Sequence, residues 1–155
     1  MERLMEHAQV KVNPFAIYIG LGLAAALLQH FVPLPFLSLQ TVRIVGATLM
    51  VISLLFGLPA LRKMFTVKTS PNPNRPTTTL ISSGPYRFTR NPMYVGLTIL
   101  YIGVLTFLQI SWGLLLLPLI VWLITVLVIH PEEKYLERKF GREYIEYKEK
   151  VRMWI

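Results

Sequence analysis

Two short polar clusters in an otherwise apolar chain contain residue types that could bind a ligand. The first is the stretch SSGPYRFTRNPMYVG, residues 82–96, in which Arg87 and Arg90 precede the pair Asn91-Pro92. Asparagine followed by proline is a typical helix start, with the asparagine side chain accepting from the first free amides. Such a start presents unpaired N–H groups and a positive dipole end. Together with the two guanidinium groups, it would bind a carboxylate or a phosphate.

Aromatic rings lie among these cations. Tyr86, Phe88 and Tyr94 could flank a flat base or a positively charged group. Cations, a helix end and aromatic rings together suit a small cofactor of mixed charge. The same residues also fit a plainer interpretation, in which a well-capped membrane helix is flanked by two arginines that reach the lipid head groups.

The second cluster begins with Glu132 and Glu133, the first acidic residues after Glu6. Only the residues QIS, 109–111, separate two long apolar runs, so these runs must form a tight antiparallel hairpin. The hairpin returns the two glutamates to the face that carries the first cluster. The sequence thus predicts one pocket with a basic and an acidic half, although acidic residues are also common in the first turn of a helix.

The residues that the chain lacks narrow the chemistry. It has no cysteine and no aspartate, and its three histidines are widely spaced, so we predict no metal site. No acidic residue lies within an apolar run, which argues against an ion-coupled transporter. The net charge of +8 is not accompanied by a nucleic-acid-binding motif. We therefore expect no nucleic-acid partner and attribute the charge to topology and to contact with anionic membrane lipids.

Long uncharged runs must position the two clusters. Only 15% of the residues are charged, against about 25% in soluble domains. Each run has nearly the length that a helix needs to cross a bilayer. We predict an all-α, polytopic membrane protein that forms a single membrane domain over residues 1–155. Its approximately four transmembrane helices are expected at residues 12–29, 44–61, 93–108 and 112–129.

The distribution of charge predicts the orientation. The segment 62–90 carries six Lys or Arg residues and no acid, whereas the connections 30–40 and 109–111 have no formal charge. By the positive-inside rule, the basic segment and both termini face the cytoplasm, from an inner or plasma membrane. The expected cofactor-binding segments, 79–94 and 130–154, then lie on the cytoplasmic side.

The C-terminal segment has helical periodicity. Leu136, Phe140, Tyr144, Tyr147 and Val151 are spaced by three or four residues and form one apolar stripe. This pattern predicts a C-terminal amphipathic helix that either lies on the membrane or folds back on the bundle.

The two clusters together resemble a known family. GPYRFTRNPMYVG, followed after the hairpin by EEKYLERKFGREYIEYKEKV, resembles the isoprenylcysteine carboxyl methyltransferase and phospholipid methyltransferase superfamily. Members of that superfamily are integral-membrane enzymes that use S-adenosylmethionine. The resemblance covers about residues 79–154, roughly half of the chain, and has both motifs in the right order and separation.

The resemblance implies which residues bind the cofactor and take part in catalysis. It implies catalytic roles for Arg90, Asn91 and Glu133. The residues that it places in the cofactor pocket are Gly84, Tyr86, Arg87, Arg90, Asn91, Pro92, Tyr94, Glu132 and Glu133. Two positions depart from the family pattern: Asn91 stands where many members have histidine, and Met153 stands where arginine is common, with Arg152 one place earlier.

The methyl acceptor stays open at this point. A lipophilic acceptor is expected, whether an isoprenylcysteine-like carboxylate, a phospholipid amine or another small hydrophobic nucleophile, with in-line transfer of the methyl group. A carboxylate or thiolate needs no base, but an ammonium must first lose a proton, for which Glu132, Glu133 and His130 are all candidates. The alternatives are an NADPH-dependent membrane reductase of lipids or sterols, whose C-terminal segment is similar, and a non-catalytic membrane relative.

Overall fold

The structure, a computed structural model, describes residues 8, 10–35, 38–72 and 75–155. Within these residues every regular element is a helix, which confirms the predicted all-α fold. In chain order the helices are α1 (Pro14–Phe31), α2 (Leu39–Thr66), the short 3-10 helix η2 (Gly84–Arg87), α3 (Pro92–Phe107), α4 (Ser111–Leu115), α5 (Leu117–Ile124), the π-helical turn η3 (Thr125–Ile129), α6 (His130–Phe140) and α7 (Arg142–Lys150).

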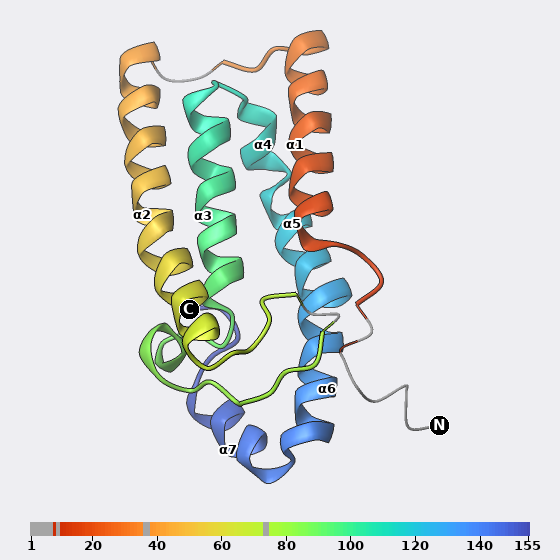
Figure 1. Cartoon of the computed structure of the whole chain (residues 1–155). Coiled ribbons are helices and arrows are strands. Elements are labelled where there is room, and N and C mark those ends of the chain that lie inside the picture. The colour runs from red at the N-terminus through yellow and green to blue at the C-terminus, as the bar shows by residue number, and fades with distance from the viewer. Residues whose placement is uncertain (1–7, 9, 36–37, 73–74) are drawn as a thin grey trace.

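The long helices run side by side along one axis (Figure 1). The α1–α2 connection and the α3–α4 turn lie at one end of the bundle. The segment that joins α2 to α3 lies at the opposite end, together with α6 and α7. The uncharged connections and the basic segment therefore occupy opposite ends, as an even number of crossings requires.

The first two helices have sequence signals at their starts. The side chain of Asn13 accepts a hydrogen bond from Phe15 N at 2.9 Å, and Pro14 fills the first position of α1. At the start of α2 the Ser38 side chain accepts from Thr41 N. Helix α2 has 28 residues, so it extends beyond the predicted span 44–61 at both ends. Length and composition make α1 and α2 candidates to cross a membrane.

The third and fourth predicted spans are shorter helices. Helix α3 begins at Pro92, as predicted, and is an apolar helix of 16 residues. The predicted span 112–129 is interrupted: α4, α5 and the turn η3 follow one another and lead directly into α6. Pro118 and Pro131 stand in the first turns of α5 and α6. Since proline cannot donate the intrahelical hydrogen bond, these two prolines account for the interruptions of the helix.

Close packing of α2 on α3 depends on glycine. A Cβ atom at Gly46 would lie 2.6 Å from Phe107 N and 2.7 Å from Gly103 O. A Cβ at Gly103 would lie 2.9 Å from Met50 N, and Gly96 faces Gly57 in the same way at 3.0 Å. Small residues at such positions let two helices approach closely, a common arrangement in membranes. This contact holds the start of α3, and with it the first polar cluster, against α2.

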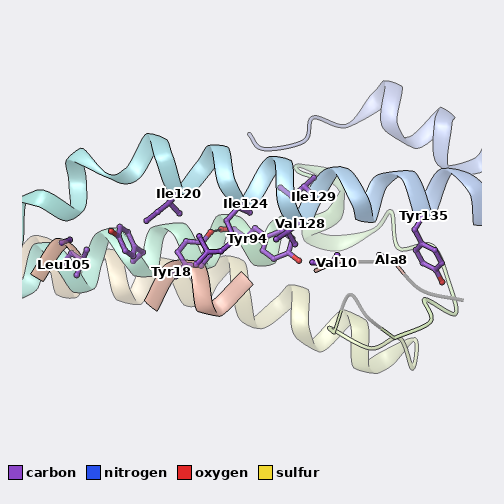
Figure 2. Close-up of a cluster of buried hydrophobic side chains, with 13 residues drawn as sticks. Ala8, Val10, Tyr18, Tyr94, Leu105, Ile120, Ile124, Val128, Ile129 and Tyr135 are labelled. Carbon is purple, nitrogen blue, oxygen red and sulfur yellow. Dashed lines mark hydrogen bonds between the residues drawn. The ribbon is translucent and has the colours of Figure 1, made fainter. Parts of the chain in front are cut away.

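The core lies between α1, α3 and α5. Figure 2 shows Tyr18, Tyr94, Ile120, Ile124 and Val128 packed along this line. The outer faces of α1 and α2 are also apolar: Ile19, Leu23, Val51 and Leu55 are 62 to 68% exposed. Apolar faces of this extent are unfavourable in water and suit a hydrocarbon environment.

The C-terminal amphipathic helix was predicted as one piece, and that prediction is wrong. The stripe is divided at Gly141, which has a φ of +53°, a region that favours glycine. Helix α6 ends before it and α7 begins after it, so the chain turns back on the bundle. Tyr144 and Tyr147 are buried, and the Tyr147 hydroxyl donates to Tyr86 O at 2.6 Å. Of the two predicted placements, folding back is the one observed.

Candidate active site

A pocket at the end of the bundle collects most of the predicted site residues. It contains about 870 Å³ of space free of atoms, including the part open to solvent. It lies where α2, α3, α6 and α7 meet the segment between α2 and α3. The lining residues are Ala8, Met64, Thr69, Ser70, Pro71, Asn72, Thr77, Thr79, Leu80, Ile81, Tyr86, Arg90, Asn91, Pro92, Met93, Tyr94, Glu132, Glu133, Tyr135, Leu136, Tyr144 and Tyr147.

A buried ion pair joins the two sequence clusters. Arg90 donates to Glu133 Oε1 from Nε at 2.9 Å and from Nη2 at 2.6 Å, and both side chains are less than a tenth exposed. The Nη1 group of Arg90 donates to the carbonyls of Lys148 and Val151, at 3.0 and 2.6 Å. A guanidinium has five N–H groups, so four are used within the protein. Arg90 therefore holds α7 and the C-terminal tail, residues 151–155, against α6.

Lys148 completes the neutralisation of Glu133. Its ammonium lies 3.3 Å from Glu133 Oε2 and 2.7 Å from Glu137 Oε1. The hydrogen bond to Glu137 is the largest cause of a raised pKa of Lys148, which keeps this cation charged. Both oxygens of Glu133 thus face cations supplied by α7 and by the segment before α3.

Asn91 and its neighbours fix the tail from the other side. The prediction that the Asn91 side chain caps α3 is wrong, because that side chain instead donates to Met153 O at 2.9 Å. Thr89 Oγ1 donates to the same carbonyl at 3.0 Å, and Arg90 N donates to Arg152 O at 2.9 Å. Backbone carbonyls near the C-terminus therefore accept hydrogen bonds from three donors in residues 89–91.

Glu132 has different contacts from Glu133. The Tyr94 hydroxyl donates to its Oε1 at 2.9 Å, and its Oε2 has no hydrogen-bond donor among the described residues. Loss of hydration on burial raises the pKa of Glu132 to about 7, an effect that the Tyr94 hydrogen bond opposes and the nearby charge of Glu133 reinforces. Glu132 is therefore a carboxyl group with one free oxygen that titrates near neutral pH.

Tyrosine side chains form much of the wall. Tyr86, Tyr135, Tyr144 and Tyr147 line the pocket. Burial raises the pKa of Tyr86, Tyr144 and Tyr147 above the usual value, so these phenols stay protonated at neutral pH. The wall is thus aromatic and uncharged.

Two of the nine predicted cofactor residues lie outside the pocket. Seven of them line it: Tyr86, Arg90, Asn91, Pro92, Tyr94, Glu132 and Glu133. Arg87 is exposed, and its guanidinium sits 5.2 Å from the centre of the Phe88 ring. Gly84 is exposed in a turn, with a φ of +65°. The basic half of the pocket is consequently smaller than the sequence indicated.

One wall of the pocket was not predicted from the sequence. No role in the site was predicted for the residues before position 79, but Thr69, Ser70, Pro71, Asn72 and Thr77 line the pocket. The hydroxyls of Thr69 and Thr78 lie 2.7 Å apart and hold this segment together. The run TTT, residues 77–79, lies directly before the first cluster and is the sequence signal from which this wall could have been predicted. In the described part of the chain no cluster of His, Cys, Asp or Glu could hold a metal ion.

Helices long enough to cross a bilayer and apolar outer faces are features of a membrane protein, and the pocket lies at one end of this bundle. The chain belongs to the phospholipid methyltransferase family, whose profile matches residues 41–143. That range runs from the first turn of α2 to the start of α7, and it includes the first cluster and both glutamates of the second.

Curated relatives are similar over part of their length. The chain is 33% identical over 72 residues to protein-S-isoprenylcysteine O-methyltransferase B of Arabidopsis thaliana, a stretch that covers 46% of this chain and 36% of the plant protein. It is 38% identical over 72 residues to protein-S-isoprenylcysteine O-methyltransferase of Saccharomyces cerevisiae, covering 46% of this chain and 30% of the yeast protein. The match thus spans about a third of these two enzymes.

A short relative matches over its full length. An uncharacterised protein of Haemophilus influenzae is 44% identical over 64 residues, which cover 36% of this chain and all of that protein. No solved structure matches the chain.

Proposed function

We propose that this chain is an integral-membrane methyltransferase that transfers a methyl group from S-adenosylmethionine to a lipophilic acceptor. The observation that carries the proposal is the pocket itself: the two motifs of the family meet there, at one end of a bundle with apolar outer faces. An acceptor dissolved in the membrane would reach the pocket from the bundle, and the cofactor would enter from the polar end.

The donor set of the pocket fits S-adenosylmethionine. The amides of Met93 and Tyr94, at the start of α3, lack acceptors in the part of the chain that the structure describes. These N–H groups, with the one remaining N–H of Arg90, suit the carboxylate of the cofactor. The tyrosine wall suits its sulfonium and its adenine ring. A dinucleotide brings several phosphate oxygens instead, and Arg90 is the single Lys or Arg among the described residues that line the pocket.

The residues of the chain mainly hold the reactants. Bound S-adenosylmethionine supplies a methyl group already activated on a sulfonium, so the protein has to align donor and nucleophile and exclude water. Of the residues expected in catalysis, we propose that Arg90, Asn91 and Glu133 are positioning residues. They act by fixing α7 and the tail over the pocket.

We propose that the chain forms one membrane domain with four crossings. Helices α1, α2 and α3 provide three, and α4, α5 and η3 together provide the fourth. The basic segment, both termini and the pocket would face the cytoplasm from an inner or plasma membrane.

Ligand-induced stabilisation tests the cofactor assignment. The purified protein in detergent is heated with S-adenosylhomocysteine or with NADPH. A ligand at 100 times its dissociation constant stabilises the fold by ~2.7 kcal/mol, so a clear rise in melting temperature is expected with S-adenosylhomocysteine. Arg87→Ala, outside the pocket, is the control that keeps the shift. A shift with NADPH alone would favour the reductase alternative, and no shift with either ligand would favour the non-catalytic one.

A further inference from the structure

The polar end of the bundle has an uneven distribution of charge. Every acidic residue that the structure describes lies in α6 or α7, where it offsets the charge of nearby Lys and Arg residues, as in the pair Arg142–Glu146. Arg62 in α2, Lys68 just after it and Arg87 in η2 form no ion pair in the described part of the chain. Uncompensated positive charge is therefore concentrated where α2 ends and in η2.

Packing brings these three cations to one side of the polar end. Met64 and Val67, in the last turn of α2 and just after it, pack against the buried Tyr86 of η2. Figure 1 shows this short helix, in green, beside the end of α2 and away from α6. The three cations are near neighbours of these packed residues in the sequence, and their side chains are exposed. They form one basic surface rather than three scattered charges.

The length of α2 places this surface at the level of the lipid head groups. The run 44–61, between Arg43 and Arg62, contains no charged residue. As a helix it is about 27 Å long, close to the thickness of the hydrocarbon core of a bilayer. Arg62 and the residues that follow it in α2 therefore project beyond the acyl chains, into the layer that contains the lipid phosphates.

Two aromatic side chains lie among the cations. Phe65 is 62% exposed and Phe88 is 70% exposed, and the Arg87 guanidinium lies 5.2 Å from the centre of the Phe88 ring. Large apolar side chains with this exposure are unfavourable in water. Basic residues beside exposed aromatic rings are typical of protein surfaces that lie in the membrane interface. The surface thus matches both the charged and the apolar part of an anionic lipid.

We propose that these five residues form a binding surface for anionic phospholipids. This anionic-lipid surface consists of Arg62, Phe65, Lys68, Arg87 and Phe88. The cations contact the phosphates of the leaflet at this end of the bundle, and the two rings insert at the boundary with the acyl chains. The sequence indicated contact with anionic lipids without a location, whereas the structure restricts it to the α2–η2 side.

The anionic-lipid surface is distinct from the pocket. None of its five residues lines the pocket, although Tyr86, directly before Arg87, does. The proposal goes beyond the proposed function, because the bound lipid is not methylated and no methyl donor is needed for it to bind. Failure of one proposal leaves the other standing.

Stabilisation by added lipid tests the anionic-lipid surface. The purified protein in a neutral detergent is titrated with phosphatidylglycerol or with phosphatidylcholine of the same acyl chains, and the melting temperature is followed. Phosphatidylglycerol is expected to raise it at a lower concentration, and this difference should shrink at high salt because ions screen exposed charges. Glycerophosphoglycerol, the head group without acyl chains, should produce no shift. Equal responses to the two lipids would overturn the proposal, and so would an equal response to the soluble head group.

A triple variant tests whether the three cations cause this preference. Each Lys or Arg near a membrane surface strengthens the attraction to anionic lipid about fivefold. Arg62→Gln/Lys68→Gln/Arg87→Gln is therefore expected to need about 10²-fold more phosphatidylglycerol for the same shift, with the response to phosphatidylcholine unchanged. Arg62→Lys/Arg87→Lys retains the charges and should keep the preference. A triple variant that responds to phosphatidylglycerol like the wild-type protein would contradict the assignment.

A second triple variant controls for net charge. Arg138→Gln/Arg142→Gln/Lys150→Gln removes three exposed cations from α6 and α7 and changes the net charge by the same amount. Its response to phosphatidylglycerol is expected to stay within a few-fold of the wild-type response. Equal losses in the two triple variants would show that the preference follows net charge, and the α2–η2 side would then not be a binding surface.

Discussion

At the scale of single residues, the site depends on where each charge is neutralised. Arg90 appears in the sequence as a cation ready for an anionic ligand, yet most of its donors are used by Glu133 and by carbonyls of the C-terminal segment. Glu132 and Glu133 are chemically identical neighbours, but two cations contact Glu133, whereas Glu132 accepts a hydrogen bond from Tyr94. A sequence cannot distinguish them, because the difference lies in contacts from α3 and α7.

Arg90→Met tests the positioning role of the buried ion pair. Removing one partner leaves Glu133 buried with incomplete compensation and frees the tail, so the unfolding free energy is expected to fall by about 3–5 kcal/mol. Chemical denaturation in detergent measures it. The control is Arg142→Met, because Arg142 and Glu146 form an exposed pair whose loss should change stability by about 1 kcal/mol or less. Equal effects of the two variants would show that Arg90 does not anchor the tail.

Tyr94→Phe tests the coupling of Tyr94 to Glu132. The Tyr94 hydroxyl donates to Glu132 Oε1 and holds the pKa of Glu132 below the value that burial alone would give. Without it the pKa of Glu132 rises, and the pH dependence of S-adenosylhomocysteine binding is expected to move to higher pH. A profile in the same position as that of the wild-type protein would mean that Glu132 does not carry the titration.

At the scale of elements, helix contacts hold the two motifs together. Helix α3 brings the first cluster, α6 brings the two glutamates, and α2 supports α3 through glycines that allow close approach. The tail after α7 then bonds to the residues just before α3, including Asn91 through Met153 O. The pocket is therefore a product of packing between elements far apart in sequence.

Gly46→Ala tests the α2–α3 contact. The added Cβ would lie 2.6 Å from Phe107 N, so one helix must shift, and a loss of about 1–3 kcal/mol in stability is expected. Gly20→Ala in α1 has no atom within 4 Å of the added Cβ and should be neutral or slightly stabilising. Melting temperatures of the two variants make the comparison. A Gly46 variant as stable as the Gly20 variant would contradict the packing.

The sequence was informative wherever a signal is local. Pro92 marks the start of α3, and the helical fold and the meeting of both motifs at one pocket follow from apolar runs and a three-residue connection. Interactions between residues far apart in the sequence could not be predicted from it. Asn91 was read as a cap because its partner, the carbonyl of Met153, is a backbone group 62 residues away. The turn at Gly141 needs a left-handed φ, which an apolar stripe does not reveal.

At the scale of the whole molecule, the bundle separates an apolar length from a polar end. The outer faces of α1 and α2 carry large exposed apolar residues, and the pocket lies at the end that also has the basic segment. A cofactor from water and an acceptor from lipid could meet at that boundary.

The absence of cysteine from the sequence allows a clean test of orientation. Single cysteines are introduced at Ser82, in the basic segment, and at Gln40, at the other end of the bundle; both side chains are exposed. In intact cells a membrane-impermeant maleimide is expected to label Gln40→Cys, whereas Ser82→Cys should react after the cells are opened. The reverse pattern would invert the proposed topology.

Transfer of a labelled methyl group tests the central claim most directly. The purified protein is placed in lipid vesicles with S-adenosylmethionine labelled in its methyl group, and the radioactivity that partitions into organic solvent is measured. A methyltransferase acting on lipophilic acceptors predicts label in the organic phase that depends on time and on the amount of enzyme. Label only in water-soluble acceptors, or no transfer by protein that binds S-adenosylhomocysteine, would contradict the account.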